Sequence, residues 1–268
     1  MKAIYHPKGK AGEYAEWACN LYVGCSAKCT YCYNRKGRFV RVLGGDVPTL
    51  KKSLIDEATA FSIFKKEVAK NIDELRKHGV FFSFVSDTML VDTIKLNEQC
   101  MRFCLINDVP VKLLTKQTWW VDELCLEIEK NGTVWNTNKL HLLTVGFTLT
   151  GCDELELESG TNWDRTEAIK KLSRLGVKTF ASLEPIITIG DTKRMIRWCD
   201  GYCDLYKVGL ESGKKYDKEE LTEFFRWILA HVGDSKLYFK DSFLKAVDIN
   251  RVELPWFCVD REYNVLGK

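Results

Sequence analysis

Three cysteines stand close together near the start of the chain, at Cys25, Cys29 and Cys32. Thiolates separated by three and then two residues can reach three corners of one cubane cluster, whereas a cluster ligated only by protein takes four cysteines. One iron would then lack a protein ligand. An open coordination position distinguishes a catalytic metal site from a closed structural one, because a small molecule can bind there. The triplet therefore predicts a reactive iron–sulfur centre.

The main alternative for these cysteines is a structural zinc site. Its fourth ligand would come from His6, Cys19 or a more distant cysteine. Structural zinc sites often contain two Cys-x2-Cys pairs, and the chain has one such pair, Cys29 with Cys32. The spacing favours the iron–sulfur cluster, and zinc stays open as an alternative.

Polar residues stand directly after five of the expected strands. Because the carboxyl ends of parallel strands meet at one end of a barrel, where active sites form, we expect these side chains to line one cavity. Such a cavity suits a zwitterionic nucleoside, whose carboxylate, ammonium and ribose hydroxyl groups each need a partner once water is removed. The residues are Ser86, Asp87, Thr115, Lys116, Thr148, Thr150, Ser182, Glu184, Glu211 and Ser212.

The elements that must position these residues alternate along the chain as β-type runs and amphipathic helical patterns. Repeated strand–helix units favour a parallel sheet with right-handed crossovers, either an open doubly wound sheet or a barrel. We expect an α/β fold with a partial (β/α)6 TIM-like barrel of parallel strands. The expected strands cover residues 17–23, 80–85, 111–114, 142–149, 177–183 and 205–210, and the expected helices cover residues 54–75, 93–106, 121–130, 165–175, 192–199 and 218–231.

The same pattern suggests how the chain is divided. We expect residues 1–234 to form the barrel and residues 235–268 a C-terminal capping tail, with a loop insertion at residues 38–52 that contains Gly44, Gly45 and Pro48. With 268 residues, of which 46% are hydrophobic, the chain is long enough to bury a sizeable core. A disordered protein is therefore not expected.

Charge and cysteine content limit the partners and the compartment. The formal charge of +3 neither requires nor excludes a polyanionic partner. The chain has no run of eighteen apolar residues and no signal-like N-terminus, so we expect a soluble cytoplasmic protein without a membrane partner. In a reducing cytoplasm, the eleven cysteines favour metal ligands or buried thiols over a disulfide framework.

The segment from Asn20 to Tyr33 resembles the cluster segment of the spore photoproduct lyase-like branch of the radical SAM superfamily, also called the DNA-repair photolyase-like group. The likeness covers roughly residues 17–190, and only the cysteine segment is highly specific. Three later segments resemble a phage-associated group of radical SAM proteins: Ser182 to Pro185, Val208 to Gly213 and Leu237 to Lys240.

The resemblance implies two cofactors, a [4Fe–4S] cluster and S-adenosylmethionine (SAM). In such enzymes an external one-electron reductant, of the flavodoxin or ferredoxin type, drives cleavage of SAM to methionine and a 5′-deoxyadenosyl radical. That radical would abstract hydrogen from a substrate that stays unidentified, with nucleic acid or a nucleotide as one candidate class.

By resemblance, Ser86, Lys116 and Thr148 fall where lyase-like enzymes contact SAM, and Tyr31 lies beside the cluster. We add the polar residues Asp87, Ser182, Glu184 and Glu211 to the expected cofactor site. Glu184 and Glu211 have an alternative role, which is to pair with lysines at the barrel mouth such as Lys207.

Two residues are candidates for a hydrogen-atom relay. Tyr33 matches a lyase position thought to carry a hydrogen atom, with simple packing as the alternative. Phe84 aligns with the hydrogen-donating cysteine of the spore lyase, and phenylalanine cannot donate in this way, so we do not expect thymine-dimer repair by that relay. Cys152 is a candidate replacement thiol, unless it is an ordinary buried cysteine.

Other functional classes stay open. The chain could be a zinc-stabilised nucleic-acid-binding module or an electron-transfer iron–sulfur protein without SAM chemistry. Arg35, Lys36, Arg38 and Arg41 follow the cysteines and would suit a nucleic-acid substrate, although such loops are usually only solvated. We expect Cys100 and Cys104 to be core residues, and Cys199, Cys203 and Cys258 to bind an auxiliary cluster only with a further ligand.

Overall fold

The computed structural model of the chain describes residues 2–37, 40–130, 137–261 and 263. Within that part, an eight-stranded sheet has the order β1-β2-β5-β6-β7-β8-β9-β10. Every neighbouring pair is parallel except β1 with β2. The strands are β1 (Ile4–Tyr5), β2 (Ala18–Cys19), β5 (Val80–Phe82), β6 (Val111–Thr115), β7 (Leu143–Thr148), β8 (Lys178–Ile186), β9 (Leu205–Leu210) and β10 (Lys236–Phe239).

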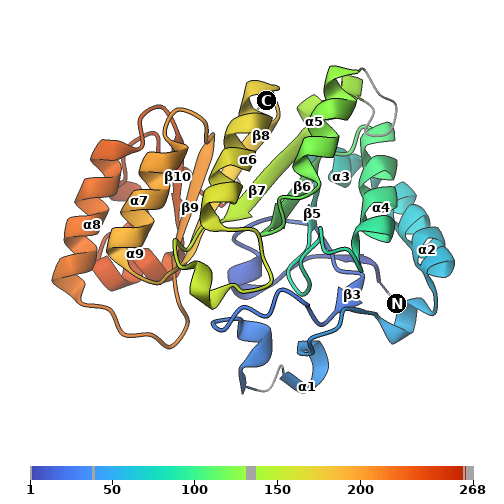
Figure 1. Cartoon of the computed structure of the whole chain (residues 1–268), viewed down its shortest axis with the longest axis horizontal. Helices are drawn as coiled ribbons and strands as arrows, with labels where there is room; N and C mark the ends of the chain where they lie inside the picture. Colours follow the sequence, from blue (N-terminus) through green and yellow to red (C-terminus); the bar gives the residue numbers. More distant parts are fainter. Residues whose placement is uncertain (1, 38–39, 131–136, 262, 264–268) are drawn as a thin grey trace.

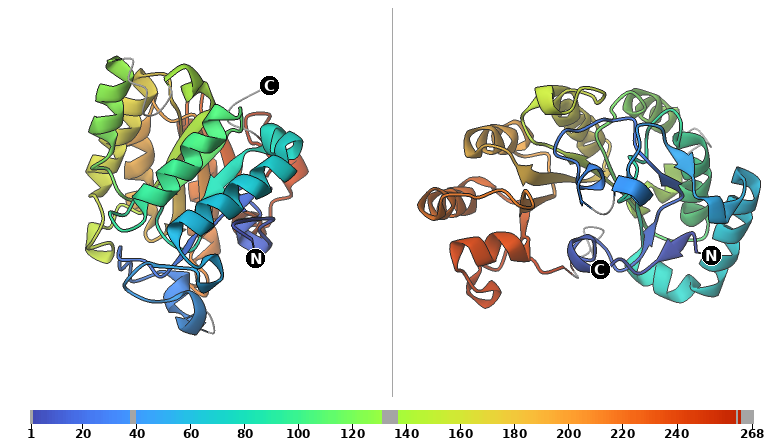
Figure 2. Two further views of the ribbon diagram at one scale, coloured as in Figure 1. Left: turned by 90° about the vertical axis from the view of Figure 1, so that its right-hand side faces the viewer. Right: turned by 90° about the horizontal axis from the view of Figure 1, so that it is seen from below.

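Helices follow the parallel strands and lie outside the curved sheet (Figures 1 and 2). A short antiparallel ribbon of β3 (Tyr22–Val23) and β4 (Thr49–Leu50) lies apart from the main sheet. This arrangement confirms the expected α/β class and the partial barrel. The helices are α1 (Val40–Leu43), α2 (Glu57–Lys70), α3 (Ile72–His78), α4 (Ile94–Ile106), α5 (Val121–Glu129), α6 (Asn162–Arg174), α7 (Ile189–Cys199), α8 (Lys218–His231) and α9 (Asp241–Val247).

Several helices begin at a side-chain cap that the sequence supplies. At α6, Thr161 accepts a hydrogen bond from the Asp164 amide, and the Asp164 carboxylate accepts one from the Thr161 amide, which is a capping box. Thr188 caps α7 and Asp217 caps α8 by accepting from the backbone three residues on. These caps set the first residues of α6, α7 and α8, which lie on the outside of the sheet.

Alternating residues of the strands face two separate apolar cores. Val111 and Leu113 of β6 belong to the larger core, between the sheet and the helices. A smaller core fills the inside of the curved sheet, with Phe81, Phe180 and Tyr238. Among the described residues, the inside of the curved sheet is therefore packed with side chains.

The N-terminal segment crosses the inside of the sheet between distant strands. The Glu13 carboxylate accepts hydrogen bonds from the Asp241 amide at 2.9 Å and from the Tyr238 hydroxyl at 3.2 Å. The Tyr14 hydroxyl is 2.7 Å from Ser182 Oγ. Since β10 and β1 lie at opposite ends of the strand order, this segment joins elements that the sheet itself does not join.

Two expected elements are divided in the structure. The predicted strand over residues 17–23 was wrong as a single element, because β2 and β3 belong to different sheets. Between them the Asn20 side chain accepts from the Ser83 hydroxyl and the Phe84 amide, at 2.7 and 2.8 Å. The helix predicted over residues 54–75 is also divided, into α2 and α3, at Asn71.

The C-terminal part contains structure that was not predicted. β10 pairs in parallel with β9, so the sheet continues through residues 236–239, and Cys258 forms a parallel bridge with Leu237. The proposed boundary after residue 234 stays a prediction. None of the helices in the described residues is long and apolar enough to cross a membrane.

Candidate functional site

The loop that carries the three cysteines, residues 24–33, is called here the cysteine loop. Its first residue, Gly24, has a φ of +80°, and a Cβ there would lie 2.5 Å from the Val47 carbonyl oxygen. The Cys25 amide donates to the Gly45 carbonyl at 2.9 Å. Only glycine fits this close approach, so residues 43–47, which are part of the predicted insertion, form the support on which the cysteine loop begins.

Cys25, Cys29 and Cys32 pack in one small apolar cluster with Ala27 and Leu90. All eleven cysteines of the chain are free thiols. Burial, with the negative Asp87 nearby, raises the pKa of Cys25 to about 11. Burial also raises the pKa of Cys29, an effect that the positive Lys116 opposes. The three thiols therefore share a partly buried site near the Lys116 cation.

The arrangement of these thiols can be compared with the two kinds of metal site. Among the described residues, no three His, Cys, Asp or Glu side chains are placed to hold a single metal ion. A structural zinc site needs such convergence, whereas a cubane binds each thiolate at a different corner. Cys25, Cys29 and Cys32 on the cysteine loop are the residues that would supply thiolates for three corners of a cubane.

Ser86 and Asp87 follow β5 and lie beside the cysteine loop, with different roles. Asp87 accepts from the Thr115 hydroxyl at 2.6 Å and from the Lys116 amide at 2.8 Å, so it ties the ends of two strands together. The Ser86 hydroxyl is buried and has no hydrogen-bond partner among the described residues. A buried hydroxyl without a partner is unfavourable, and it fits a site that binds a polar ligand.

Lys116, at the end of β6, lies over the ring of Tyr31, with 5.6 Å from Nζ to the ring centroid. Burial acts to lower the pKa of Lys116, but the negative groups at Cys29, Glu156 and Asp87 outweigh it and raise the pKa. Within the described residues Lys116 forms no ion pair. The Lys116 ammonium group therefore lies near Cys29 and forms no ion pair with a carboxylate of the described residues.

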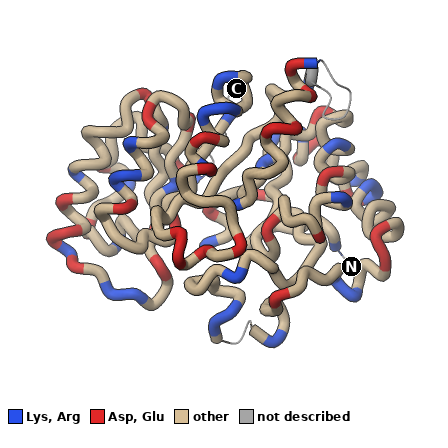
Figure 3. The backbone as a smooth tube through the Cα atoms, in the orientation of Figure 1, with Lys and Arg blue, Asp and Glu red and all other residues tan. Residues whose placement is uncertain are grey.

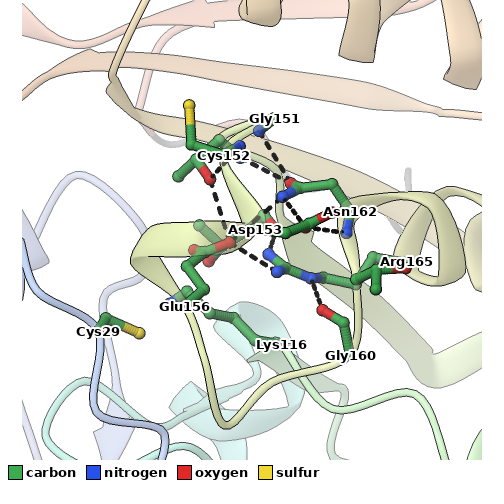
Figure 4. A network of polar contacts seen from close by, with 12 residues as sticks. Cys29, Lys116, Gly151, Cys152, Asp153, Glu156, Gly160, Asn162 and Arg165 are labelled. Atoms are coloured by element: carbon green, nitrogen blue, oxygen red, sulfur yellow. Dashed lines mark hydrogen bonds and ion pairs between the residues drawn. The ribbon is translucent and has the colours of Figure 1, made fainter.

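A buried polar network next to the cysteine loop was missed by the sequence reasoning (Figure 4). Glu156 and Arg165 form an ion pair of 2.6 Å in which both side chains are 0% exposed. Burial alone would raise the pKa of Glu156, yet Arg165 and Lys116 hold that pKa below its ordinary value. The Tyr31 hydroxyl also donates to Glu156. Nothing local marks these residues, because charged side chains in a loop and on a helix usually face water.

Ser182 and Glu184 lie in a second polar group inside the sheet. Glu184 pairs with Lys240, with 2.7 Å between Oε2 and Nζ. The Tyr14 hydroxyl donates to the same Glu184 oxygen at 2.9 Å. Glu184 thus pairs with a lysine, as the alternative expected, and that lysine is Lys240; its place in the cofactor site stays a prediction. Ser182 is hydrogen-bonded to Tyr14.

Glu211 likewise pairs with a lysine, Lys36, at 2.9 Å. Arg35 pairs with Asp46, so two cations of the expected basic cluster already have acidic partners. Arg38 lies outside the described residues. Basic and acidic positions are interspersed along the chain (Figure 3), which gives no support to a uniform nucleic-acid-binding patch.

The two relay candidates are placed differently. Tyr33 is 52% exposed, and its hydroxyl donates to the Phe84 carbonyl oxygen. Cys152 is 4% exposed, and its Sγ donates to Asp191 at 3.4 Å. Burial and this hydrogen bond raise the pKa of Cys152 to about 12. The Cys152 thiol points away from Cys29 (Figure 4), so the structure does not bring it to the cysteine loop.

Of the remaining expected site residues, Thr148 is 4% exposed, and its carbonyl oxygen accepts from Arg165 at 2.5 Å. Cys100 and Cys104 are fully buried in the larger core between the sheet and the helices, as expected. Cys199 and Cys203 belong to the same core.

Comparison with known proteins bears on this site. The radical SAM superfamily matches the chain over residues 19–199. No curated protein matches it. Among solved structures, Streptococcus suis SuiB has 12% sequence identity and a TM-score of 0.53, over 87% of this chain and 51% of SuiB.

Two further SuiB structures are similar. SuiB bound to S-adenosylmethionine has 13% identity and a TM-score of 0.52, over 85% of this chain and 51% of SuiB. SuiB bound to its precursor peptide SuiA has 14% identity and a TM-score of 0.54, over 86% and 50%. The chain thus spans about half the length of SuiB, and at these identities the likeness shows a shared fold.

Proposed function

We propose that this chain, which belongs to the radical SAM superfamily, is an enzyme that uses a [4Fe–4S] cluster and SAM, and that Cys25, Cys29 and Cys32 hold the cluster. The observation that supports the assignment is the grouping of these three thiols on one loop, where they pack in one small apolar cluster with Ala27 and Leu90. When bound, the cluster and SAM supply a 5′-deoxyadenosyl radical by one-electron cleavage.

We assign to the chain's own residues the tasks of binding, orientation and exclusion of water. The hydroxyl of Ser86, which has no partner among the described residues, would bind the amino acid end of SAM. Lys116 would pair with the carboxylate of that end as a compact charge. Thr148 would complete the site, and Tyr31 and Leu90 would keep water from the cluster side.

The other expected cofactor contacts have partners within the protein. Asp87 holds the ends of β5 and β6 in place, which supports a positioning role beside the cofactor. Ser182, Glu184 and Glu211 already have partners in the protein. We propose that these three shape the wall of the substrate cavity. Tyr33 and Cys152 stay as relay candidates, with Tyr33 favoured by its place on the cysteine loop.

The finer assignment is also a proposal. We place the chain in the spore photoproduct lyase-like branch, with features of the phage-associated group, on the motifs that it shares with them. We propose a flavodoxin or ferredoxin as reductant and a nucleic acid or nucleotide as the first substrate class to test. SuiB was solved with a peptide, so a peptide is the second class.

Two further proposals concern the whole chain. The eleven free cysteines support a reducing compartment such as the cytoplasm. We also propose that residues 1–234 form the radical SAM core and residues 235–268 a capping segment, although β10 contributes to the sheet from within the latter.

The test is to reconstitute the cluster without oxygen, add dithionite and SAM, and measure 5′-deoxyadenosine in the wild type and in Cys29→Ala. We expect product from the wild type and none from the variant. Zinc in place of iron and sulfide would support the nucleic-acid-binding alternative. A cluster that is reduced but leaves SAM intact would support an electron-transfer protein. Deuterium transfer from candidate nucleotides and peptides into 5′-deoxyadenosine would then identify the substrate class.

A further inference from the structure

The loop between β7 and α6, residues 149–161, lies against the cysteine loop and contains the buried Glu156. Three contacts join the two loops. The Thr30 amide donates to the Leu155 carbonyl oxygen at 3.0 Å, and the Tyr31 hydroxyl donates to Glu156 Oε1. At the exposed edge, Lys28 pairs with Glu158 at 3.5 Å. The cysteine loop is therefore attached to a loop more than a hundred residues away in the sequence.

The two oxygens of Glu156 have different tasks. Oε2 accepts three hydrogen bonds from its own side of the contact, from Arg165 at 2.6 Å, Thr150 at 3.1 Å and Asn162 at 3.4 Å. Oε1 is bonded to the cysteine loop, through Tyr31. The carboxylate is therefore held by one oxygen on its own loop, and the other oxygen accepts the hydrogen bond from the cysteine loop.

Arg165 is held as firmly as its partner. Its Nε donates to the Gly160 carbonyl at 2.8 Å and its Nη1 donates to the Thr148 carbonyl at 2.5 Å. A buried ion pair is costly to desolvate and contributes little net stability unless its geometry is well satisfied. Here the Arg165 donors reach the Thr148 carbonyl at the end of β7 and Gly160 and Glu156 in the loop that follows it, so the pair provides a rigid anchor point.

We infer that Glu156 is a positioning residue for the cysteine loop, and this inference rests on the proposed role of Cys25, Cys29 and Cys32 as cluster ligands. Tyr31 lies between Cys29 and Cys32 in the chain. By fixing the Tyr31 hydroxyl, Glu156 fixes the backbone between these two thiols and thus their separation. A cubane requires that separation to be kept within narrow limits in both oxidation states.

Two variants remove the hydrogen bond between Tyr31 and Glu156 in different ways. Tyr31→Phe deletes the hydroxyl and keeps the buried ion pair. The double variant Glu156→Met with Arg165→Met replaces the pair by apolar side chains of similar size, which avoids leaving a buried charge unpaired. Glu158→Gln is the matched control, because it changes a carboxylate on the same loop whose contact to the cysteine loop is exposed.

The first measurement is amide hydrogen exchange of the protein without cluster. Loss of a hydrogen bond to a charged acceptor predicts about tenfold faster exchange at residues 25–34 in Tyr31→Phe. We expect the same in the double variant and a change of less than about twofold in Glu158→Gln, because exposed ion pairs contribute little. General destabilisation would instead speed exchange throughout the sheet.

The second measurement is the midpoint potential and the electron paramagnetic resonance line shape of the reconstituted cluster. We expect both to change in Tyr31→Phe and to match the wild type in Glu158→Gln. If residues 25–34 exchange at the wild-type rate in Tyr31→Phe, the inference is wrong, whether or not the double variant folds. A wild type that keeps its cluster but never cleaves SAM would refute the proposed function and leave the effect on exchange in place.

Discussion

The ring of Phe180 lies directly against Gly146, so that a Cβ at position 146 would be 2.1 Å from Phe180 Cζ. The two residues are paired on the neighbouring strands β7 and β8. The ring fills the inside of the sheet, where it packs with Tyr14 and Phe81. A missing side chain on β7 thus provides the space for a large one on β8.

We therefore predict that Gly146→Ala lowers the free energy of unfolding by about 1–3 kcal/mol, because overpacking forces the ring or the strand to move. Urea denaturation measures the change. Gly190→Ala is the control, since only the Thr188 hydroxyl lies within reach of a Cβ there, at 4.0 Å. Its stability should stay equal or rise by up to about 1 kcal/mol. Equal loss in both variants would contradict this account of Gly146.

The ion pair of Lys240 with Glu184 gives a second prediction. Lys240 is 2% exposed and lies over the ring of Tyr14 at 4.3 Å. Lys240→Met leaves the Glu184 carboxylate without its cation, and we expect a loss of about 3 kcal/mol or more in unfolding free energy. Adding Glu184→Met should restore much of the loss. If the double variant has no higher unfolding free energy than Lys240→Met, the ion pair between Lys240 and Glu184 does not account for the stability of this region.

Lys207 gives a pH-dependent prediction. It is 8% exposed and lies 4.6 Å from the centroid of the Tyr14 ring. Burial, followed by repulsion from Lys112 and Lys240, lowers the pKa of Lys207 to about 7. Between that value and the ordinary lysine pKa of about 10.4, the unfolded chain binds more protons than the folded one. Stability should therefore rise with pH in this window.

We expect the unfolding free energy of the wild type to rise from pH 7 to pH 8.5 relative to Lys207→Met, by at most about 1.4 kcal/mol per pH unit. Measuring the difference between the two proteins removes the contribution of groups that titrate in both, such as the cysteines. Parallel curves for the two proteins would show that Lys207 keeps its ordinary pKa.

The cysteine loop and the buried network beside it show what a sequence can and cannot reveal. The spacing of Cys25, Cys29 and Cys32 is a local signal and needs no knowledge of the fold. Helix α8 was also predicted correctly, because apolar periodicity and the helix stop before Gly233 are local. Glu156 and Arg165, in contrast, are buried only because two distant loops meet. The strand β10 was missed because its four residues follow a polar turn and pair with a strand some thirty residues earlier.

Ser86 provides the prediction that separates ligand binding from stability. Its hydroxyl is buried without a partner among the described residues, so removing it should not destabilise the protein and can raise the unfolding free energy slightly. If the hydroxyl binds SAM as proposed, Ser86→Ala should weaken SAM binding roughly tenfold, which corresponds to one hydrogen bond to a charged group. Equilibrium binding of SAM to the reconstituted enzyme and urea denaturation measure the two effects.

Thr88→Ala is a matched control, because the Thr88 hydroxyl is likewise buried without a partner among the described residues but is not an expected SAM contact. Equal SAM affinity in wild type and Ser86→Ala would remove Ser86 from the cofactor site.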